Sequence, residues 1–387
     1  MRILHVISSV DPSRDAAVPA LRELARANAE PGDDIEVCSL DAPGEVPAHD
    51  DELIVHALGD ALPRRAGAPA LLRWLRANVH RFDTVIVHGV ARRHGDAVWR
   101  AARELSFPYY VFAHGVPGTS FRQRFSLRGL RECLRWPLAG YRVLRDAEAV
   151  LFRCEAERAL ARRTHWLYRA REQVVGYGVC APSLRAGQVD AFDEQLPQLH
   201  GKRFLLYIGQ IDVAHGCDLL VEAFAQVARR EPELQLVLAG PSTHRCQLQL
   251  AARAAALGVA SRVHWAGVLT GDLKWGALRA CDAFVLPSHE DSFGGAVVEA
   301  MACRKAVLVS TEVEIAREIA AGGGGLVAAD TAEGTVSLLE RWLELSSSQR
   351  RLLGERSRAC YEHHFTLAGA GQRLRKLLDE GPKPQGV

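Results

Sequence analysis

The sequence predicts an α/β protein with two doubly wound, parallel-sheet domains. Short apolar runs rich in β-branched and aromatic residues alternate with longer segments of helical periodicity over nearly all of the 387 residues. Such alternation is typical of parallel sheets covered by helices. It stops in a polar, proline-containing stretch at residues 181–200 and then starts again, and a chain of this length can bury two cores.

The predicted strands fall into two groups, one on each side of the polar stretch. The first domain is expected over residues 1–190 and the second over residues 200–365. Strands are predicted in the first domain at residues 3–7, 35–39, 53–55, 84–87, 109–112 and 149–152, and in the second at residues 204–208, 235–239, 262–265, 283–286 and 306–309.

Polar and glycine clusters follow several of these strands, at residues 8–15, 88–89, 114–115, 209–216, 240–241 and 288–295. Ligands of doubly wound sheets bind outside the carboxyl ends of the strands. The two rims are therefore predicted to face each other across one interdomain cleft.

Composition narrows the class of protein. With 48% hydrophobic and 24% charged residues, the chain is typical of an ordinary globular protein. No apolar run approaches the roughly 18 to 20 residues that span a bilayer, and residues 3–10 are interpreted as a strand rather than a signal peptide. The nine cysteines are scattered and never spaced Cys-x2-Cys, which favours a reducing cytosol over a disulfide framework or a zinc site.

Basic residues are concentrated in one part of the chain. Between Asp60 and Arg171 there are 22 Arg and no Lys against nine Asp and Glu, although the net charge of the whole chain is only +2. Arginines and aromatic residues are interleaved within residues 118–145, which suits the face of an anionic membrane. The alternative is a solvated helix whose arginines pair locally or hold an anionic substrate. No nucleic-acid-binding motif accompanies the charge, so no nucleic-acid partner is expected.

The most informative segment is residues 287–303, between a predicted strand and a predicted helix. Asp291 and Glu299 are separated by seven residues. Between them, Phe293, Gly294 and Gly295 could bring bare backbone N–H groups against a phosphate or a sugar hydroxyl at the start of the helix.

This acid-x7-acid segment resembles the signature of the retaining, GT-B-fold glycosyltransferases of family 4, the glycosyl transferases group 1. The resemblance covers essentially the whole chain, and residues 299–303 are its most specific part. It implies a metal-independent enzyme without a cofactor, acting on a nucleotide sugar that is UDP- or GDP-linked. It also implies that the C-terminal helix, within residues 366–387, packs back on the first domain.

The resemblance also implies roles for single residues. Glu299 would accept hydrogen bonds from the ribose hydroxyls, and Asp291 stands where the family has a Glu that touches the transferred sugar. His114 resembles the family's histidine that faces the donor sugar, and His88 repeats the His-Gly pattern one strand earlier. The alternatives are a helix N-terminal acid for Glu299, a turn cap for Asp291 and structural histidines.

The chain departs from the family pattern at the Gly-Arg-x4-Lys-Gly motif. It has Gly209 followed by Gln210, and His215 in place of the Lys. A bound diphosphate could favour protonated His215, whereas Gln210 can donate only a neutral hydrogen bond, which is about half as strong as a charge-assisted one. Alternatively, both are only polar loop residues.

A second departure is the loop at residues 9–18, where the family usually has glycines and this chain has none. Arg14 lies in this loop. One hypothesis is that Arg14 reaches across the predicted cleft and supplies part of the positive charge missing at Gln210 and His215. The alternative is a solvent-exposed loop arginine.

Two functions follow from these patterns. The first is a retaining hexosyltransferase that transfers a sugar to a lipid-linked or saccharide acceptor at the inner face of the cytoplasmic membrane, in bacterial surface polysaccharide assembly. The second is a catalytically impaired protein of the same fold that binds nucleotide sugars or acts as a scaffold. The sequence contains no Gly-x-Ser-x-Gly elbow, Walker loop or Asp-x-Asp. Serine-hydrolase chemistry, P-loop nucleotide binding and a metal ion are therefore not expected.

Overall fold

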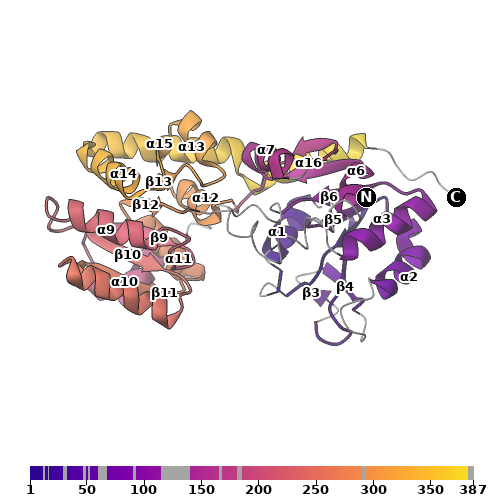
Figure 1. Ribbon diagram of the computed structural model, residues 1–387, viewed down its shortest axis with the longest axis horizontal. Helices are drawn as coiled ribbons and strands as arrows, with labels where there is room; N and C mark the ends of the chain where they lie inside the picture. Colours follow the sequence, from indigo (N-terminus) through magenta and orange to yellow (C-terminus); the bar gives the residue numbers. More distant parts are fainter. Residues whose placement is uncertain are drawn as a thin grey trace. The chain divides into compact units, whose positions relative to one another are not determined.

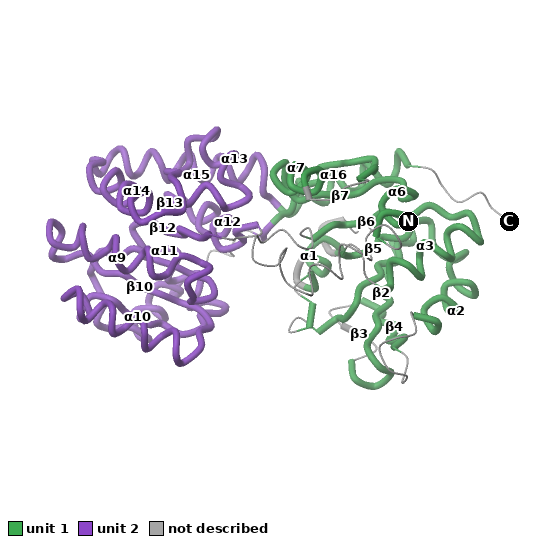
Figure 2. The backbone as a smooth tube through the Cα atoms, in the orientation of Figure 1, with its two compact units in different colours: residues 1–178, 367–387 green, residues 179–366 purple. Residues whose placement is uncertain are grey.

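The computed structural model describes residues 1–11, 14–15, 17–28, 33–46, 49–50, 53–59, 68–89, 93–114, 140–164, 168–180, 185–289 and 293–381. The chain forms two compact units (Figure 2). Unit 1 comprises residues 1–178 and 367–387, and unit 2 comprises residues 179–366.

Unit 1 is built on an eight-stranded sheet with the order β3-β4-β2-β1-β5-β6-β7-β8. Figure 1 labels β3, β4, β5 and β6 of this sheet. Its strands are β1 (Arg2–Val6), β2 (Asp34–Ser39), β3 (His49–Asp50), β4 (Leu53–Ala57), β5 (Thr84–His88), β6 (Tyr109–Phe112), β7 (Ala149–Phe152) and β8 (Glu172–Val174). Only β3 pairs antiparallel among them. The strand order reverses between β1 and β5, which makes this pair the switch point where such sheets bind ligands.

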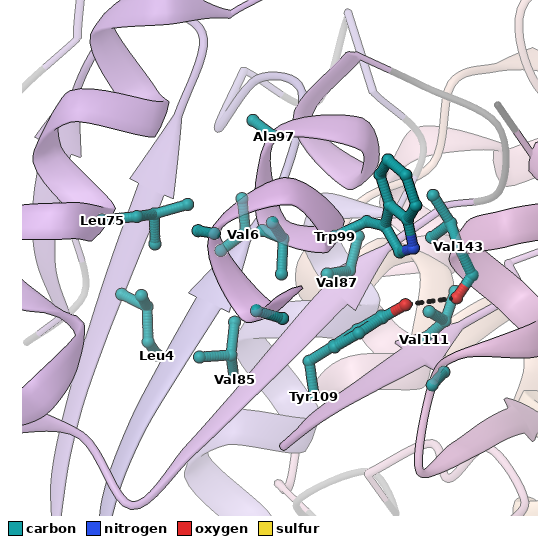
Figure 3. Close-up of a cluster of buried hydrophobic side chains, with 14 of the residues drawn as sticks. Leu4, Val6, Leu75, Val85, Val87, Ala97, Trp99, Tyr109, Val111 and Val143 are labelled. Carbon is teal, nitrogen blue, oxygen red and sulfur yellow. Dashed lines mark hydrogen bonds between the residues drawn. The ribbon is translucent and has the colours of Figure 1, made fainter. Parts of the chain in front are cut away.

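Helices cover both faces of this sheet. They are α1 (Val18–Asn28), α2 (Pro69–Asn78), α3 (Arg93–Leu105), α6 (Tyr141–Arg145), α7 (Glu155–Thr164) and α16 (Leu367–Glu380), with a short 3₁₀ turn η1 (Val79–Arg81). Because side chains alternate along a strand, Val85 and Val87 pack with α2 and α3 (Figure 3), whereas Ile86 packs with Leu24 and Leu374 on the opposite face.

Unit 2 is built on a six-stranded parallel sheet with the order β11-β10-β9-β12-β13-β14. Its strands are β9 (Phe204–Ile208), β10 (Gln235–Ala239), β11 (Val263–Gly267), β12 (Ala283–Leu286), β13 (Ala306–Ser310) and β14 (Gly325–Ala328). The central strands are buried almost throughout, as expected for parallel strands covered on both faces. Its helices are α8 (Gln188–Gln195), α9 (Cys217–Val227), α10 (His244–Ala256), α11 (Gly271–Ala280), α12 (Gly295–Ala302), α13 (Ala316–Gly322), α14 (Ala332–Glu344) and α15 (Ser347–His364), with 3₁₀ turns η3 (Pro197–Leu199) and η4 (Ala260–Arg262).

The predicted fold class, two doubly wound parallel-sheet domains, is confirmed. The chain leaves unit 1 at residue 178, earlier than the expected boundary at 190, because α8 packs in unit 2. There Gln188 Nε2 donates to Asp272 Oδ1 at 2.9 Å, and Phe192 is fully buried. At the other end of the chain, α16 belongs to unit 1.

Three strands were not predicted from the sequence, namely β3, β8 and β14. β3 has two residues, and β8 is a polar Glu-Gln-Val segment at the edge of its sheet. Edge strands expose one side to water and often carry charges, so β3 and β8 lack the apolar pattern that identifies a central strand. β14 is a short Gly-Leu-Val-Ala segment whose preceding glycines indicate a turn.

Candidate functional site

The loops after β9 and β12 lie against each other at the carboxyl edge of the second sheet. β9 and β12 are paired, parallel neighbours. The His289 backbone N–H, after β12, donates to the Ala214 carbonyl oxygen in the loop after β9, at 3.1 Å. The structure therefore brings together two motifs that are more than 70 residues apart in the sequence.

Gly216 allows this contact. It has a φ of +71°, and a Cβ built there would lie 2.0 Å from the Pro287 carbonyl oxygen. No real Cβ tolerates such a distance, and the left-handed backbone also disfavours other residues.

Gly209 is fixed from a third loop, the one after β10. Its N–H donates to the Ala239 carbonyl oxygen at 3.0 Å, and the Ile211 N–H donates to the Pro241 carbonyl oxygen at 2.9 Å. Gly240, with a φ of +138°, passes so close that a Cβ there would lie 1.8 Å from the Gly209 carbonyl oxygen. Side chains add to these backbone contacts, since the Tyr207 hydroxyl donates to the Gln210 carbonyl oxygen at 2.6 Å and the Ser242 hydroxyl donates to the Ile211 carbonyl oxygen at 3.1 Å.

Helix α12 begins at the same sheet edge. Gly294 is its N-cap in the left-handed conformation, with a φ of 74° and no side-chain cap. At Gly295, the first helical residue, no described atom lies within 4 Å of the position of a Cβ. The first-turn N–H groups of a helix lack intrahelical acceptors and favour an anion, so this glycine pair forms a surface suited to a phosphate. Asp291 lies outside the described residues.

Phe293 has a different position from its glycine neighbours. Its side chain is only 3% exposed and packs edge-on against Phe365, with ring centroids 6.1 Å apart. The ring anchors the loop in the core of unit 2. Phe293 can therefore contribute only its backbone groups to ligand binding.

Glu299, in the second turn of α12, is paired with a residue that the sequence analysis did not identify. Lys274 Nζ on α11 donates to Glu299 Oε1 at 2.6 Å, and both side chains are largely buried. Lys274 also lies over the ring of Trp275 at 4.9 Å. The Lys274 contact uses one of the two carboxylate oxygens, and a carboxylate has acceptor capacity on both.

Asp212 organises the two residues that replace the family's fixed cations. Its Oδ1 accepts the His215 backbone N–H at 2.9 Å and lies 2.6 Å from His215 Nδ1. Gln210 Nε2 donates to Asp212 Oδ2 at 2.9 Å. With Nδ1 donating to Asp212, only the protonated imidazole of His215 has a second N–H, at Nε2, to offer an anion.

Arg14 is surrounded by carboxylates of its own unit. Its Nη1 lies 2.9 Å from Glu45 Oε2 and 3.5 Å from Asp41 Oδ1, and its Nε lies 3.5 Å from Asp11 Oδ2. The hydrogen bond with Glu45 raises the pKa of Arg14. These contacts offset the guanidinium charge within unit 1, while the Arg14 side chain remains 54% exposed, so a role for Arg14 toward a donor stays a prediction.

Two aspartate side chains, Asp41 and Asp15, accept hydrogen bonds from residues of the glycine-free first loop and from Ser8 just before it. Asp41, buried after β2, accepts the Ser9 hydroxyl at 2.6 Å and the Val10 N–H at 2.9 Å. Asp15 accepts the Ser8 hydroxyl and the Ala17 N–H. These bonds satisfy the buried backbone N–H groups of Val10 and Ala17.

His114 follows β6 with a left-handed φ of 47° and joins a chain of histidines. Its Nε2 lies 2.6 Å from His88 Nδ1, and His88 Nε2 lies 2.8 Å from His5 Nδ1. Burial lowers the pKa of His5 to about 4, and burial followed by the neighbouring His114 lowers the pKa of His88 well below its usual value. Among the described residues no group of His, Cys, Asp or Glu could hold a metal ion.

The basic segment at residues 118–145 lies outside the described residues except for 140–145. In that short part, the Arg142 guanidinium lies over the Trp99 ring at 5.6 Å, and Arg145 pairs with Asp146 at 2.6 Å. These two arginines pair locally. No described helix is long and apolar enough to cross a membrane.

The chain matches two family models that together span most of its length. "Glycosyl transferase 4-like domain" matches residues 16–178, and "Glycosyl transferases group 1" matches residues 188–359. Two doubly wound, largely parallel sheets, one in each unit, are the architecture of the GT-B glycosyltransferases. The chain belongs to the group 1 glycosyltransferases of the family 4 type.

Similar proteins agree with this assignment. The chain is 29% identical to mannosylfructose-phosphate synthase of Agrobacterium fabrum over 49% of its length, and 30% identical to D-inositol 3-phosphate glycosyltransferase of Geodermatophilus obscurus over 48%. Each match spans 44% of the relative, less than half of its length.

Solved structures match over nearly the whole chain. Sucrose-phosphate synthase from Thermosynechococcus elongatus has a TM-score of 0.78 at 20% identity, covering 98% of this chain and 99% of that one. HepE from Anabaena, solved in complex with UDP-glucose, has a TM-score of 0.76 at 17% identity with the same coverage. At these identities the similarity supports the fold alone.

Gly216→Ala is expected to destabilise unit 2 by about 3 kcal/mol, since the new Cβ adds overlap with Pro287 to the strain of a left-handed backbone. Gly258→Ala is the matched control. Its φ is +75°, but no described atom lies within 4 Å of the Cβ position, so only about 1 kcal/mol of backbone strain is expected. Urea unfolding measures both losses. Equal losses would contradict the close contact between the two loops.

Proposed function

We propose that this chain is a metal-independent, retaining hexosyltransferase that transfers a sugar from a UDP- or GDP-linked donor to a lipid-linked or saccharide acceptor. Its place would be bacterial surface polysaccharide assembly. The observation that carries the proposal is the junction in unit 2 where the loops after β9 and β12 meet, beside the open first turn of α12. Family membership gives the reaction class.

The geometry of α12 supports binding of a nucleoside diphosphate. The N-terminal N–H groups from Gly295 onward are suited to phosphate oxygens, with the helix dipole adding about half a positive charge. Glu299 lies one turn further along the same helix, where its carboxylate would accept hydrogen bonds from ribose hydroxyls. HepE, which shares the fold, has been solved with UDP and with UDP-glucose.

Sugar transfer requires that charge developing on the leaving diphosphate be stabilised. In this chain, that stabilisation would come from the α12 N-terminus and from Nε2–H of protonated His215, since Gln210 carries no charge. The leaving phosphate would itself take the proton of the acceptor hydroxyl, so no protein nucleophile is required. Asp212 would hold His215 in place through Nδ1 while Nε2 faces the anion.

A catalytically impaired nucleotide-sugar-binding protein is the second candidate. One observation favours it: both residues that replace the family's cations are bonded to the carboxylate of Asp212. A negative charge at this position opposes diphosphate binding unless His215 is protonated.

Thermal shift with UDP-, GDP- and ADP-sugars, followed by turnover assays on each donor that binds, tests the proposal. At least one donor is expected to bind and to be consumed. Glu299→Gln is expected to weaken donor affinity about tenfold, because a charge-assisted hydrogen bond becomes a neutral one. Glu362→Gln, an exposed change on α15, is the control and should leave affinity unchanged.

The outcomes separate the two candidates. Binding without turnover on saccharide or lipid-linked acceptors would favour the impaired protein. Absence of binding by every donor would contradict both functions. Equal affinity of Glu299→Gln and the control would remove Glu299 from the site.

We further propose that the protein acts at the inner face of the cytoplasmic membrane through residues 118–145. The arginine-rich, aromatic composition of this sequence supports the proposal. Flotation with liposomes is expected to show binding to anionic vesicles that weakens as salt is raised, because the attraction is screened. Equal behaviour with neutral and anionic vesicles would contradict it.

A further inference from the structure

Three histidines on neighbouring elements of unit 1 form a continuous hydrogen-bond chain. His5 lies in β1, His88 ends β5 and His114 follows β6, and these three strands are adjacent in the sheet. Their rings are stacked, with centroids 5.1 Å apart for the first pair and 4.9 Å for the second. Phe112 stacks on His114 at 4.4 Å, which restricts the tilt of the last ring.

The buried end of this hydrogen-bond chain, at His5, determines which ring donates and which accepts in each hydrogen bond. A neutral imidazole has one N–H donor and one acceptor nitrogen. His5 Nε2 is buried and has no hydrogen-bond partner among the described residues. An orphaned buried N–H is rarer in proteins than an under-used acceptor, so the proton of His5 belongs on Nδ1, where it has a partner.

Each donor then fixes the next. His5 Nδ1–H donates to His88 Nε2, so His88 carries its proton on Nδ1 and donates to His114 Nε2. His114 accepts at Nε2, and in its neutral form it carries its proton on Nδ1. The reverse direction would place an N–H on His5 Nε2, where no described acceptor lies.

A fourth histidine is close to the chain without being part of it. His94 Nε2, near the start of α3, donates to the backbone carbonyl oxygen of His88 at 2.7 Å. This bond holds the end of β5 against α3 and does not involve the His88 ring. The direction of the chain therefore depends on His5 and on the two ring-to-ring bonds.

We propose that His5 and His88 are positioning residues that fix His114 as the neutral tautomer with its proton on Nδ1. The inference rests on the proposed function, with His114 in the role facing the donor sugar that the family resemblance implies for it. A fixed tautomer makes every hydrogen bond through Nδ1 one in which His114 donates, which suits a sugar hydroxyl and requires no proton rearrangement on binding. The lowered pKa values of His5 and His88 agree with a neutral chain.

The test is the two-bond ¹H–¹⁵N spectrum of the full-length protein labelled with ¹⁵N in its histidine rings, with the His114 signals assigned from a His114→Gln variant. The proposal predicts a protonated Nδ1 and an unprotonated Nε2 for His114. A wild-type spectrum with the proton on Nε2, or with a mixture of both tautomers, would overturn it. This measurement needs neither donor nor turnover, so a failure of the transferase proposal would be seen separately.

Two nearly isosteric variants test the cause. His88→Asn can present an amide N–H near the position of the imidazole Nδ1, whereas His88→Asp presents an ionised oxygen that only accepts. His88→Asn should keep the His114 proton on Nδ1, and His88→Asp should move it to Nε2. Identical His114 spectra in the two variants, each shown to be folded by its thermal transition, would contradict the positioning role.

Activity provides a second readout. Relative to His88→Asn, His88→Asp is expected to lower kcat about tenfold or more with little change in KM. The reason is that Nδ1 of His114 would then be unprotonated and could not donate a hydrogen bond to the sugar. A purely structural role for His88 predicts equal kcat in the two folded variants, and that result would also overturn the proposal.

Discussion

The parallel pairing of β9 with β12 is the constraint on which the candidate site depends. It places the ends of two strands side by side although they lie far apart in the chain, and the His289 to Ala214 hydrogen bond then joins their loops. Contact at this distance is possible only because Gly216 has no side chain. The start of α12 and the turn at Asp212 lie beside this junction, so the geometry of the proposed phosphate site follows from strand order rather than from any one residue.

In each unit, the candidate site residues near the carboxyl edge of the sheet are hydrogen-bonded to a buried or half-buried polar side chain. Asp212 holds His215, Lys274 holds Glu299, and His5 holds His114 through His88. His215, Glu299 and His114 therefore each have a polar partner within their own unit. In the proposed function, a nucleotide-sugar donor would compete with Asp212 for His215 and with Lys274 for Glu299.

Much of this arrangement follows from local sequence. The central strands are continuous apolar runs, and the glycine pair before Glu299 indicates a helix start, so fold class and the α12 motif are predictable. Lys274, Asp212 and His5 were not identified because their roles come from neighbours in space: Lys274 meets Glu299 only when α11 packs beside α12. The domain boundary was misplaced for the same reason, since α8 looks like a polar linker until its packing on α11 is known.

Hydrogen exchange with and without UDP or GDP is the sharpest test of the proposed nucleotide site, because it reports which backbone amides a nucleoside diphosphate contacts. Saturating nucleotide is expected to slow exchange in residues 209–216 and in the first turn of α12, while α14, elsewhere in unit 2, is unchanged. Protection confined to other segments, or no change at saturating UDP and GDP, would contradict the assignment of this sheet edge as the nucleotide-sugar site.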